Sequence, residues 1–530
     1  MTFQSRIELA APAQEGQLAP ASGAPVPVVV TIIVAATLAA ALLRIWGIGS
    51  RSLWLDEAYS GWFSALSWSA LWLETPGYEP HPPLYYSLLK LWRLLAGGEA
   101  GGLRGLSALA GIATVPVMAL AARELARLTR AKRPLLLVVA AAALAALSPR
   151  LFVIGQDARP YALLALAYAC AIWGWLRLSL RFRDAAAGAW RDWALLGTGT
   201  AFVLWLHGIG ILYAGALLAA LLVSAAPGAG RARWTRLAVT VAAVCAVYAP
   251  CLAILAGRGR DWSNGWLVWD PARFPGAMLE LLGLHHFDEM ATPTIALAAF
   301  PALLFLGLRS LSRARQAAPA WGLALLILAP PFAAAAISQL GTPIFLPRTL
   351  VAVLVPAYML IAYAVASLPR RAAAVGGGLL AALIAANLAQ AAARPDLEPW
   401  REVAATLKQE MRPGDVIWVY PNDVEIPLER ALGDGAAIAP IPASYPALGV
   451  AGTHPSGSPA VVAIDGIAAR RWAARNAPPP GATIWLLRGG PFFFDRDGEV
   501  LAALSRGRRH GRPRRWHDLE LRPLHPDVPR

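Results

Sequence analysis

Two adjacent acids, Asp56 and Glu57, stand in the aromatic stretch "RSLWLDEAYSGWF", directly after a long apolar run. A carboxylate is a common general base for activating a hydroxyl or amine nucleophile. Because an ionisable residue near a bilayer is costly, the pair invites a functional explanation. It also fits an ordinary helix start, where acids stabilise the N-terminal end of the helix dipole. The aromatic neighbours, which favour a loop lying along a membrane surface, are Trp54, Tyr59, Trp62, Trp68 and Trp72.

Further polar residues stand at the edges of other apolar runs. His81 in "EPHPPLYY" precedes two prolines that suit a first helical turn, and its ring either begins that helix or contacts a phosphate. Arg159 in "GQDARPYALL" either extends its charge to the interface or binds a phosphate with its guanidinium. His207 lies in a hairpin between two apolar runs, where it is expected on the outer side. Together with Glu79, the two histidines can approach an acceptor or a divalent cation, so the metal requirement stays open.

The composition assigns these residues to a membrane protein. Hydrophobic residues make up 57% of the 530 and charged residues only 15%, against about 25% charged in soluble domains. Apolar segments of bilayer length recur at 28–48, 82–97, 103–122, 134–149, 160–180, 193–207, 209–226, 235–256, 291–308, 319–338, 348–367 and 372–392. They predict a polytopic α-helical membrane protein with about 11 to 13 transmembrane helices.

The charge distribution predicts the orientation. The net charge of +15 arises largely from arginine clusters in short loops between apolar runs, which the positive-inside rule places in the cytoplasm. We therefore expect no nucleic acid partner. The loop at 49–81 carries four acids against a single arginine and is expected outside. Five apolar segments between His81 and His207 cannot return the chain to that side, so we expect a re-entrant segment at 149–160, where prolines bracket a poor helix.

The chain divides into three parts. Residues 1–27 are expected to be a disordered cytoplasmic tail, and 28–393 a membrane domain with 49–81 as its first outer loop. After 393, strand candidates at 415–420, "AVVAIDG" and "ATIWLLRGG" alternate with helical stretches and predict a small C-terminal extracytoplasmic α/β domain at 394–530 with a basic tail. The three cysteines fall in apolar segments, so no disulfide framework is expected.

Five stretches in order, "SLWLDEAYS", "HPPLYYSLLKLW", "LRGLSALAGIATVPV", "SPRLFVIGQDARPYALL" and "PRTLVAVLVPAYML", together resemble the bacterial polyprenyl-phosphate-dependent glycosyltransferases of the C-type membrane fold. This superfamily includes protein O-mannosyltransferases, the lipid A aminoarabinose transferase and rhizobial galacturonosyltransferases. The resemblance covers about residues 48–367. It implies a multi-pass protein of the bacterial inner membrane that transfers a sugar, with inversion, from a polyprenyl-phosphate donor on the extracytoplasmic face.

The resemblance also implies roles for particular residues. Asp56 matches the family's catalytic acid in the first outer loop, and Glu57 would support it. The candidates to hold the donor phosphate are His81, Arg159, Tyr161 and Arg348. The chain has His81 where the aminoarabinose transferases carry a lysine before the two prolines, which leaves the acceptor open among lipid, glycan and protein.

A membrane transporter or lipid flippase without glycosyl transfer is the alternative. Transporters tend to show repeated halves and ionisable residues near the membrane midplane. In this sequence the polar residues gather at one face, and we find no internal repeat.

Overall fold

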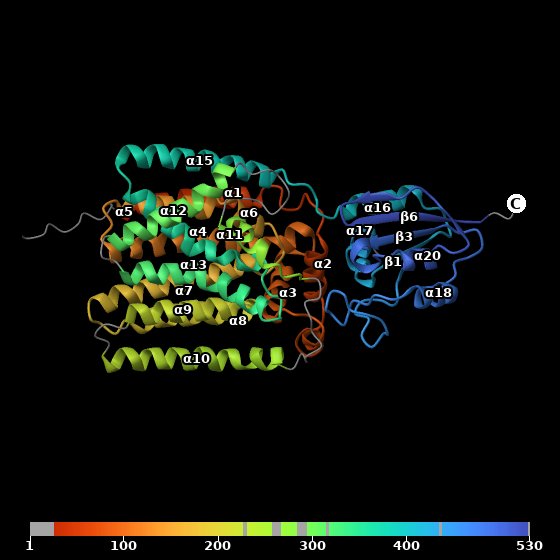
Figure 1. Cartoon of the computed structure of the whole chain (residues 1–530), viewed down its shortest axis with the longest axis horizontal. Coiled ribbons are helices and arrows are strands. Elements are labelled where there is room, and N and C mark those ends of the chain that lie inside the picture. Colours follow the sequence, from red (N-terminus) through yellow and green to blue (C-terminus); the bar gives the residue numbers. More distant parts are fainter. Residues whose placement is uncertain are drawn as a thin grey trace, which may run out of the picture.

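The computed structural model describes residues 26–225, 230–256, 267–282, 294–313, 317–433 and 437–527 of the chain. The expected tail at 1–27 therefore lies almost wholly outside the described residues. A helical bundle fills one part of the molecule, and a sheet domain covers one end of that bundle (Figure 1). Apart from α2 and α3, which are described below, the helices of the bundle are α1 (Val26–Ile45), α4 (Ala100–Thr129), α5 (Pro134–Leu147), α6 (Pro149–Gly155), α7 (Tyr161–Arg183), α8 (Trp190–Leu206), α9 (Gly210–Ala225), α10 (Arg231–Ala256), α11 (Phe274–Leu282), α12 (Thr294–Arg313), α13 (Ala317–Gln339), α14 (Leu354–Ser367) and α15 (Arg370–Ala392).

Helix length and composition confirm a polytopic membrane protein. In the described part of the chain seven helices are long and apolar enough to cross a bilayer, or eight if the bent α5–α6 pair is one span. Helices α8 and α9 are shorter, at 17 and 16 residues, and pack with α7 in the same bundle. The lower end of the expected range, about 11 helices, is reached only if α8, α9 and α12 also cross.

The course of the chain does not support the expected re-entrant segment at 149–160. Helices α5 and α6 meet at an angle of 49° where Pro149 interrupts the helix, but the pair still runs from one end of the bundle to the other. Beyond α6, Gln156 donates to the carbonyl of Trp46 (2.9 Å) and accepts from Arg51 (3.3 Å), which places it at the Asp56 end.

The segment that does not cross is α3 (Leu84–Ala96). Its 13 residues span about 20 Å, less than the hydrocarbon thickness of about 30 Å. The C-terminal half of α3 contacts the outer loop and the start of α4: Lys90 and Arg93 donate to the carbonyls of Leu66 and Gly61, and Trp92 to that of Gly102. Helix α4, the α5–α6 pair, α7 and α8 then bring the chain back to the Asp56 end.

The outer loop that carries Asp56 is largely helical. It contains α2 (Leu55–Phe63), a π-helical turn η1 (Ala70–Glu74) and a 3₁₀ turn η2 (Thr75–Gly77). Another 3₁₀ segment, η4 (Pro347–Val353), leads into α14 and presents Arg348 at the same end of the bundle.

The C-terminal domain is a six-stranded sheet with helices. Its elements are α16 (Trp400–Glu410), β1 (Val416–Tyr420), η5 (Asn422–Val424), α17 (Glu425–Leu432), β2 (Ile438–Pro440), α18 (Gly466–Arg475), β3 (Ile484–Gly489), α19 (Pro491–Phe494), α20 (Glu499–Leu504), β4 (Arg508–His510), β5 (Arg514–Trp516) and β6 (Leu519–Pro526). The strand order is β2-β1-β3-β6-β4, with β5 also paired to β6. Strand β1 runs parallel to β2 and β3, and β6 runs antiparallel to β3.

This domain confirms the expected small α/β fold and corrects two of its details. The strand candidates at 415–420 and 482–490 form β1 and β3, but "AVVAIDG" (460–466) makes only one isolated bridge, between Ala463 and Thr453. Its apolar side chains fill the core beneath turns instead of joining the sheet. The basic stretch at 506–515 is not a tail, because it forms β4 and β5, where Arg515 pairs with Glu520 at 2.8 Å.

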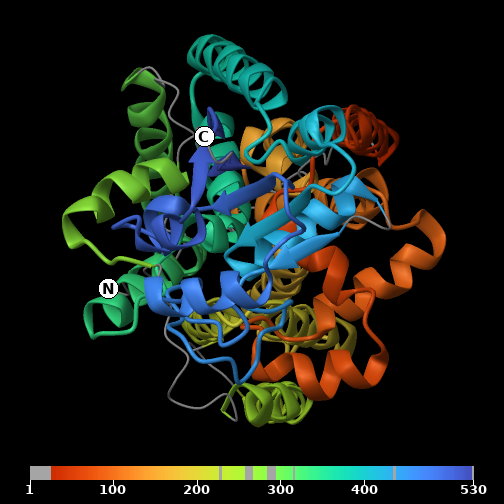
Figure 2. The same cartoon turned by 90° about the vertical axis from the view of Figure 1, so that its right-hand side faces the viewer.

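The C-terminal domain sits on α2 and the residues before it. The Asp396 carboxylate accepts from the Ser52 amide (3.0 Å), and the Glu398 carboxylate accepts from the Leu55 amide (2.8 Å). Viewed from this end, the sheet domain lies in front of the helices (Figure 2). The expectation that Asp56 and the C-terminal domain share one side of the bundle therefore agrees with their direct contacts.

This arrangement predicts a labelling pattern. In a variant without the three native cysteines, single cysteines at Ser67 in the outer loop and Ala474 on α18 should both react with a membrane-impermeant reagent in intact cells. A cysteine at Ala186, between α7 and α8 at the opposite end, should react only after permeabilisation. All three positions are exposed. Labelling of Ala186 but not Ala474 in intact cells would reverse the orientation expected from the arginine-rich loops.

Candidate functional site

Asp56 lies where three segments meet at the covered end of the bundle. It stands in the first turn of α2, and its side chain is 23% exposed. Its Oδ2 lies 3.3 Å from Nη2 of Arg348 on η4 and 3.8 Å from Nη2 of Arg159, which comes just before α7. The Nη1 of Arg159 also donates to the Asp56 carbonyl at 3.1 Å. Two arginines from distant parts of the sequence thus face one carboxylate.

These charges keep Asp56 ionised. Burial alone would raise the pKa of its carboxyl group. The positive charges of Arg159, Arg348 and, less strongly, His81 outweigh burial, so the net pKa of Asp56 lies below its usual value. A carboxylate held by two guanidinium groups is a weak proton acceptor. It becomes a stronger one when another anion takes up those groups.

A second chain of contacts extends from Arg159 to His81 and Glu79. The Nη2 of Arg159 lies 3.5 Å from Nε2 of His81, while His81 Nδ1 lies 2.5 Å from Oε1 of Glu79. The contact with Glu79 suits an imidazole that donates through Nδ1. Glu79 also accepts from the Tyr86 hydroxyl at 2.8 Å. Burial opposes ionisation of Glu79, but the neighbouring His81 dominates and lowers its net pKa.

His207 closes this side of the site. Its ring centroid lies 4.7 Å from that of His81 and 6.0 Å from that of Tyr161. Burial, with the nearby charge of His81, holds the pKa of His207 well below its usual value, so the ring is neutral. Its Nδ1 accepts from the Ile209 amide at 3.2 Å, and its buried Nε2 has no hydrogen-bond partner among the described residues. A neutral ring whose Nδ1 accepts a hydrogen bond carries its proton on Nε2. The buried Nε2–H group can therefore donate a hydrogen bond to a bound molecule.

Glu57 has different surroundings from its neighbour Asp56. It is fully buried, and Arg104 donates a hydrogen bond to each of its carboxylate oxygens, from Nε to Oε1 at 2.7 Å and from Nη2 to Oε2 at 2.6 Å. The Ala158 amide donates to Oε1 as well, at 2.8 Å. Glu57 therefore ties α2 to α4 and to the loop that carries Arg159. Its expected part in catalysis stays a hypothesis, and these contacts suit a positioning residue.

A cavity of about 360 Å³ opens beside Asp56. Arg348 and Tyr161 line it, and the Arg348 guanidinium lies 5.2 Å from the ring centroid of Trp54, which is also in the wall. Trp54 in turn donates to Asp157 at 2.8 Å. Burial and the neighbouring Glu57 raise the pKa of Asp157 to about 7. The cavity offers guanidinium groups and an aromatic wall, which suit a phosphate joined to an apolar or sugar group.

The structure brings the predicted site residues together, apart from Glu57, whose side chain is taken up by Arg104. Sequence reasoning missed three residues around the cavity: Arg104, Asp157 and Arg394. Arg104 interrupts an apolar helix, and a charged residue there was the available signal. Asp157 lies two residues before Arg159 in a stretch already singled out, whereas Arg394 follows α15 with no distinguishing pattern.

The question of a divalent cation stays open. Among the described residues no group of three or more histidine, cysteine, aspartate or glutamate side chains is arranged to hold a metal ion. Glu79 and His81 bond to each other, and His207 contacts the His81 ring edge to face.

Comparisons with known proteins define the fold. No family model and no curated protein sequence matches the chain. Among solved structures, ArnT from Cupriavidus metallidurans in the apo state is similar over 93% of this chain and 97% of its own, with 15% identity and a TM-score of 0.59. The same protein bound to undecaprenyl phosphate gives a TM-score of 0.57 at 15% identity, over 94% and 98% of the two chains.

A second similar protein comes from an archaeon. The oligosaccharyltransferase AglB from Archaeoglobus fulgidus, in complex with an inhibitory peptide and a dolichol-phosphate, is similar over 91% of this chain and 72% of its own, with 13% identity and a TM-score of 0.56. The chain therefore has the C-type membrane glycosyltransferase fold. The resemblance noted in the sequence is confirmed at the level of the fold.

Proposed function

We propose that this chain is a glycosyltransferase that moves a sugar, with inversion, from a polyprenyl-phosphate donor to an acceptor on the extracytoplasmic face of a bacterial inner membrane. The observation that carries the proposal is the pair of guanidinium groups, Arg159 and Arg348, that face Asp56, with Arg348 also lining a neighbouring cavity. The solved structures with this fold support it, since one ArnT structure holds undecaprenyl phosphate and an AglB structure holds a dolichol-phosphate with a peptide.

Donor binding uses the arginines. A guanidinium offers two parallel donors that match phosphate oxygens, so Arg159 and Arg348 bind the donor phosphate in place of Asp56. Tyr161 lies in the cavity wall, and the neutral His207 presents its free Nε2 proton nearby. Because the phosphate takes over the two positive charges, the pKa of Asp56 rises toward its usual value when donor binds.

Transfer follows as a single displacement. The acceptor hydroxyl or amine attacks the anomeric carbon of the sugar while Asp56 takes its proton. A bond forms between the acceptor atom and the anomeric carbon, and the bond from that carbon to the phosphate oxygen breaks. The electron pair of the broken bond stays on the phosphate, where Arg159 and Arg348 stabilise the extra charge. One displacement inverts the anomeric centre.

The C-terminal domain helps to form the acceptor side of the site. Tyr59, one turn after Asp56, donates to Asp423 of η5 at 2.8 Å. Trp62 packs edge to face against Tyr445, with ring centroids 5.1 Å apart. An acceptor that reaches Asp56 from the aqueous side passes beside these residues. Their aromatic and acidic character suits a sugar, lipid headgroup or peptide acceptor.

Consumption of donor tests the proposal. Purified protein in detergent is incubated with a polyprenyl-phosphate sugar carrying a radiolabelled sugar, in the presence of membrane lipid and peptide extracts as acceptors. We expect release of polyprenyl phosphate together with transfer of label to one acceptor fraction. Intact donor after prolonged incubation, in a protein that binds polyprenyl phosphate, would contradict a transferase and favour the transporter alternative.

The arginines carry a separate prediction. Arg159→Ala should raise the KM for the donor by about 10- to 100-fold, as expected for the loss of a hydrogen bond between charged groups. Arg159→Lys should raise the KM less, because lysine keeps the positive charge and loses only the two parallel hydrogen-bond donors of the guanidinium group. Arg412→Ala, which removes an exposed arginine of the C-terminal domain, is the matched control and should leave the KM unchanged. Equal donor KM in Arg159→Ala and wild type would reduce Arg159 to a structural anchor.

A further inference from the structure

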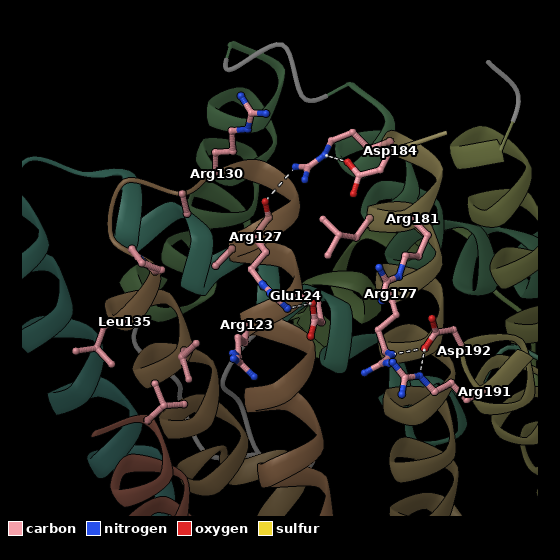
Figure 3. A pocket seen from close by; sticks show the side chains of 17 residues that line it. Arg123, Glu124, Arg127, Arg130, Leu135, Arg177, Arg181, Asp184, Arg191 and Asp192 are labelled. Atoms are coloured by element: carbon pink, nitrogen blue, oxygen red, sulfur yellow. Dashed lines mark hydrogen bonds and ion pairs between the residues drawn. The ribbon is translucent and has the colours of Figure 1, made fainter. Parts of the chain in front are cut away.

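A cluster of seven arginines lines a cavity at the end of the bundle opposite Asp56. This cavity has a volume of about 850 Å³ and lies between α1, α4, α5, α7 and α8. Figure 3 shows arginines of α4 on one side of it and arginines of α7 and α8 on the other. The charged residues in its wall are Arg123, Glu124, Arg127, Arg130, Arg177, Arg181, Arg183, Asp184, Arg191 and Asp192.

The wall has a strong excess of positive charge. Seven arginines face three acids, which leaves a formal excess of four positive charges. All three acids are already engaged: Asp192 lies 2.5 Å from Arg177, Glu124 lies 3.4 Å from Arg127, and Asp184 lies 3.4 Å from Arg183. Within the described residues, the side chains of Arg123, Arg130 and Arg181 make no ion pair or hydrogen bond.

The positive-inside rule accounts for arginines near this end of the bundle, and the structure shows in addition how they are spaced. Six of the seven lie within helices, and only Arg130 follows one. Arg123 and Arg127 are four residues apart on α4, as are Arg177 and Arg181 on α7. Like charges at this spacing on a helix destabilise it. A bound anion would relieve that repulsion on both helices at once.

An apolar surface continues from the charged part of the cavity. Val29 of α1, Leu135 and Val138 of α5, and Leu180 of α7 belong to the same wall. Of these helices α1 and α7 are long and apolar enough to span a membrane. The cavity thus offers guanidinium groups at the end of the bundle and hydrocarbon side chains toward the bilayer.

The surroundings of Asp192 indicate independently that the cavity is preorganised to bind a ligand. Its side chain is only 1% exposed, and it holds Arg177 and Arg191 from α7 and α8. Its Oδ2 has no hydrogen-bond partner among the described residues. A buried carboxylate that fixes two arginines at a cavity wall orders their guanidinium groups in advance, which lowers the cost of binding a ligand there.

We propose that this cavity binds the headgroup of an anionic phospholipid from the leaflet opposite the Asp56 site. The phosphate lies among the arginines, and an acyl chain runs along the apolar wall. Basic pockets between transmembrane helices are known to take such headgroups. The volume exceeds what one phosphate needs, so a headgroup with two phosphates fits best. The proposal does not depend on the glycosyltransferase activity.

Lipid titration of the purified full chain tests the proposal. The melting temperature in detergent, and lipid adducts in native mass spectrometry, are followed with three probes: diphosphatidylglycerol, phosphatidylcholine with matched chains, and inorganic pyrophosphate. We expect diphosphatidylglycerol alone to raise the melting temperature and to persist as an adduct. A matching response to phosphatidylcholine would mean non-specific lipid binding, and a matching response to pyrophosphate would mean a soluble-anion site. Either result would overturn the proposal.

A charge-matched pair of variants locates the site. The variant Arg123→Gln/Arg130→Gln/Arg181→Gln removes the three cavity arginines that make no ion pair with another described residue, and should weaken diphosphatidylglycerol binding by at least about tenfold. The control triple variant removes three exposed arginines from the same end of the bundle but outside the cavity: Arg313→Gln, Arg370→Gln and Arg371→Gln. It should bind like wild type. Equal loss of binding in both triple variants would show that net charge, and not this cavity, attracts the lipid.

Discussion

Asp56→Asn should lower sugar transfer by roughly 10²- to 10⁴-fold, which is the usual contribution of general-base assistance. The amide is nearly isosteric with the carboxylate, but it cannot take the acceptor proton. Donor binding should persist or tighten, since the substitution frees Arg159 and Arg348 from their ion pairs with Asp56. The loss should therefore appear in kcat and not in the KM for the donor. Turnover of a polyprenyl-phosphate sugar, measured at saturating donor, gives this comparison.

Two control variants bracket this result. Glu74→Gln removes an exposed acid from the same outer loop and should leave transfer unchanged. Glu57→Gln should cost less than Asp56→Asn, because a glutamine can still accept from Arg104 with one oxygen. An Asp56→Asn protein that keeps both its wild-type melting curve and its wild-type kcat would remove Asp56 from the chemistry.

Loss of the Arg104 side chain should be the most destabilising single change near the site. Arg104→Met leaves Glu57 as an uncompensated charge in a fully buried position. Removing one partner of a buried ion pair typically costs about 3–5 kcal/mol. Arg104 also donates to the carbonyls of Ile48, Arg51 and Ser52, at 3.0, 3.0 and 2.8 Å. We expect a lower melting temperature and faster hydrogen exchange of the α2 amides.

The partner residue and the rest of α4 supply the controls for this prediction. Arg127→Met removes an arginine from the same helix whose side chain is 58% exposed, and such a surface pair contributes at most about 1 kcal/mol. Glu57→Met/Arg104→Met should recover much of the lost stability, because two apolar side chains replace the buried charges. If Arg104→Met and Arg127→Met have the same melting temperature, the Glu57–Arg104 ion pair does not hold α2 in place.

The positions of the candidate site residues followed from the sequence because they stand at the ends of apolar runs. Hydropathy locates those ends, and the arginine-rich loops predict which ends share a side. Asp56 and Arg159 are candidates for this reason and Arg348 through the family resemblance, and the structure places both arginines within 4 Å of Asp56. Their chemical roles remain proposals.

Other features could not be obtained from local patterns. The Glu57–Arg104 pair joins residues 47 positions apart, and its formation depends on how α2 and α4 pack, which no local spacing encodes. The segment that forms α3 is apolar enough to resemble a span, but its 13 helical residues are too few to cross. The run at 460–466 has strand-like side chains, and yet β1 pairs directly with β2 and β3, and the run makes only the bridge between Ala463 and Thr453.

The anomeric configuration of the product tests the central claim most directly, because Asp56 can act on the sugar in two chemically distinct ways. As a base it supports one displacement, which inverts the anomeric centre. As a nucleophile it would form a glycosyl ester and then release the sugar with retention. The product formed by wild-type protein from a donor of defined configuration is examined by NMR. If Asp56 is a general base, the wild-type product has the inverted configuration, and an Asp56→Asn protein that still binds donor forms no product. A product with retained configuration would contradict this role of Asp56.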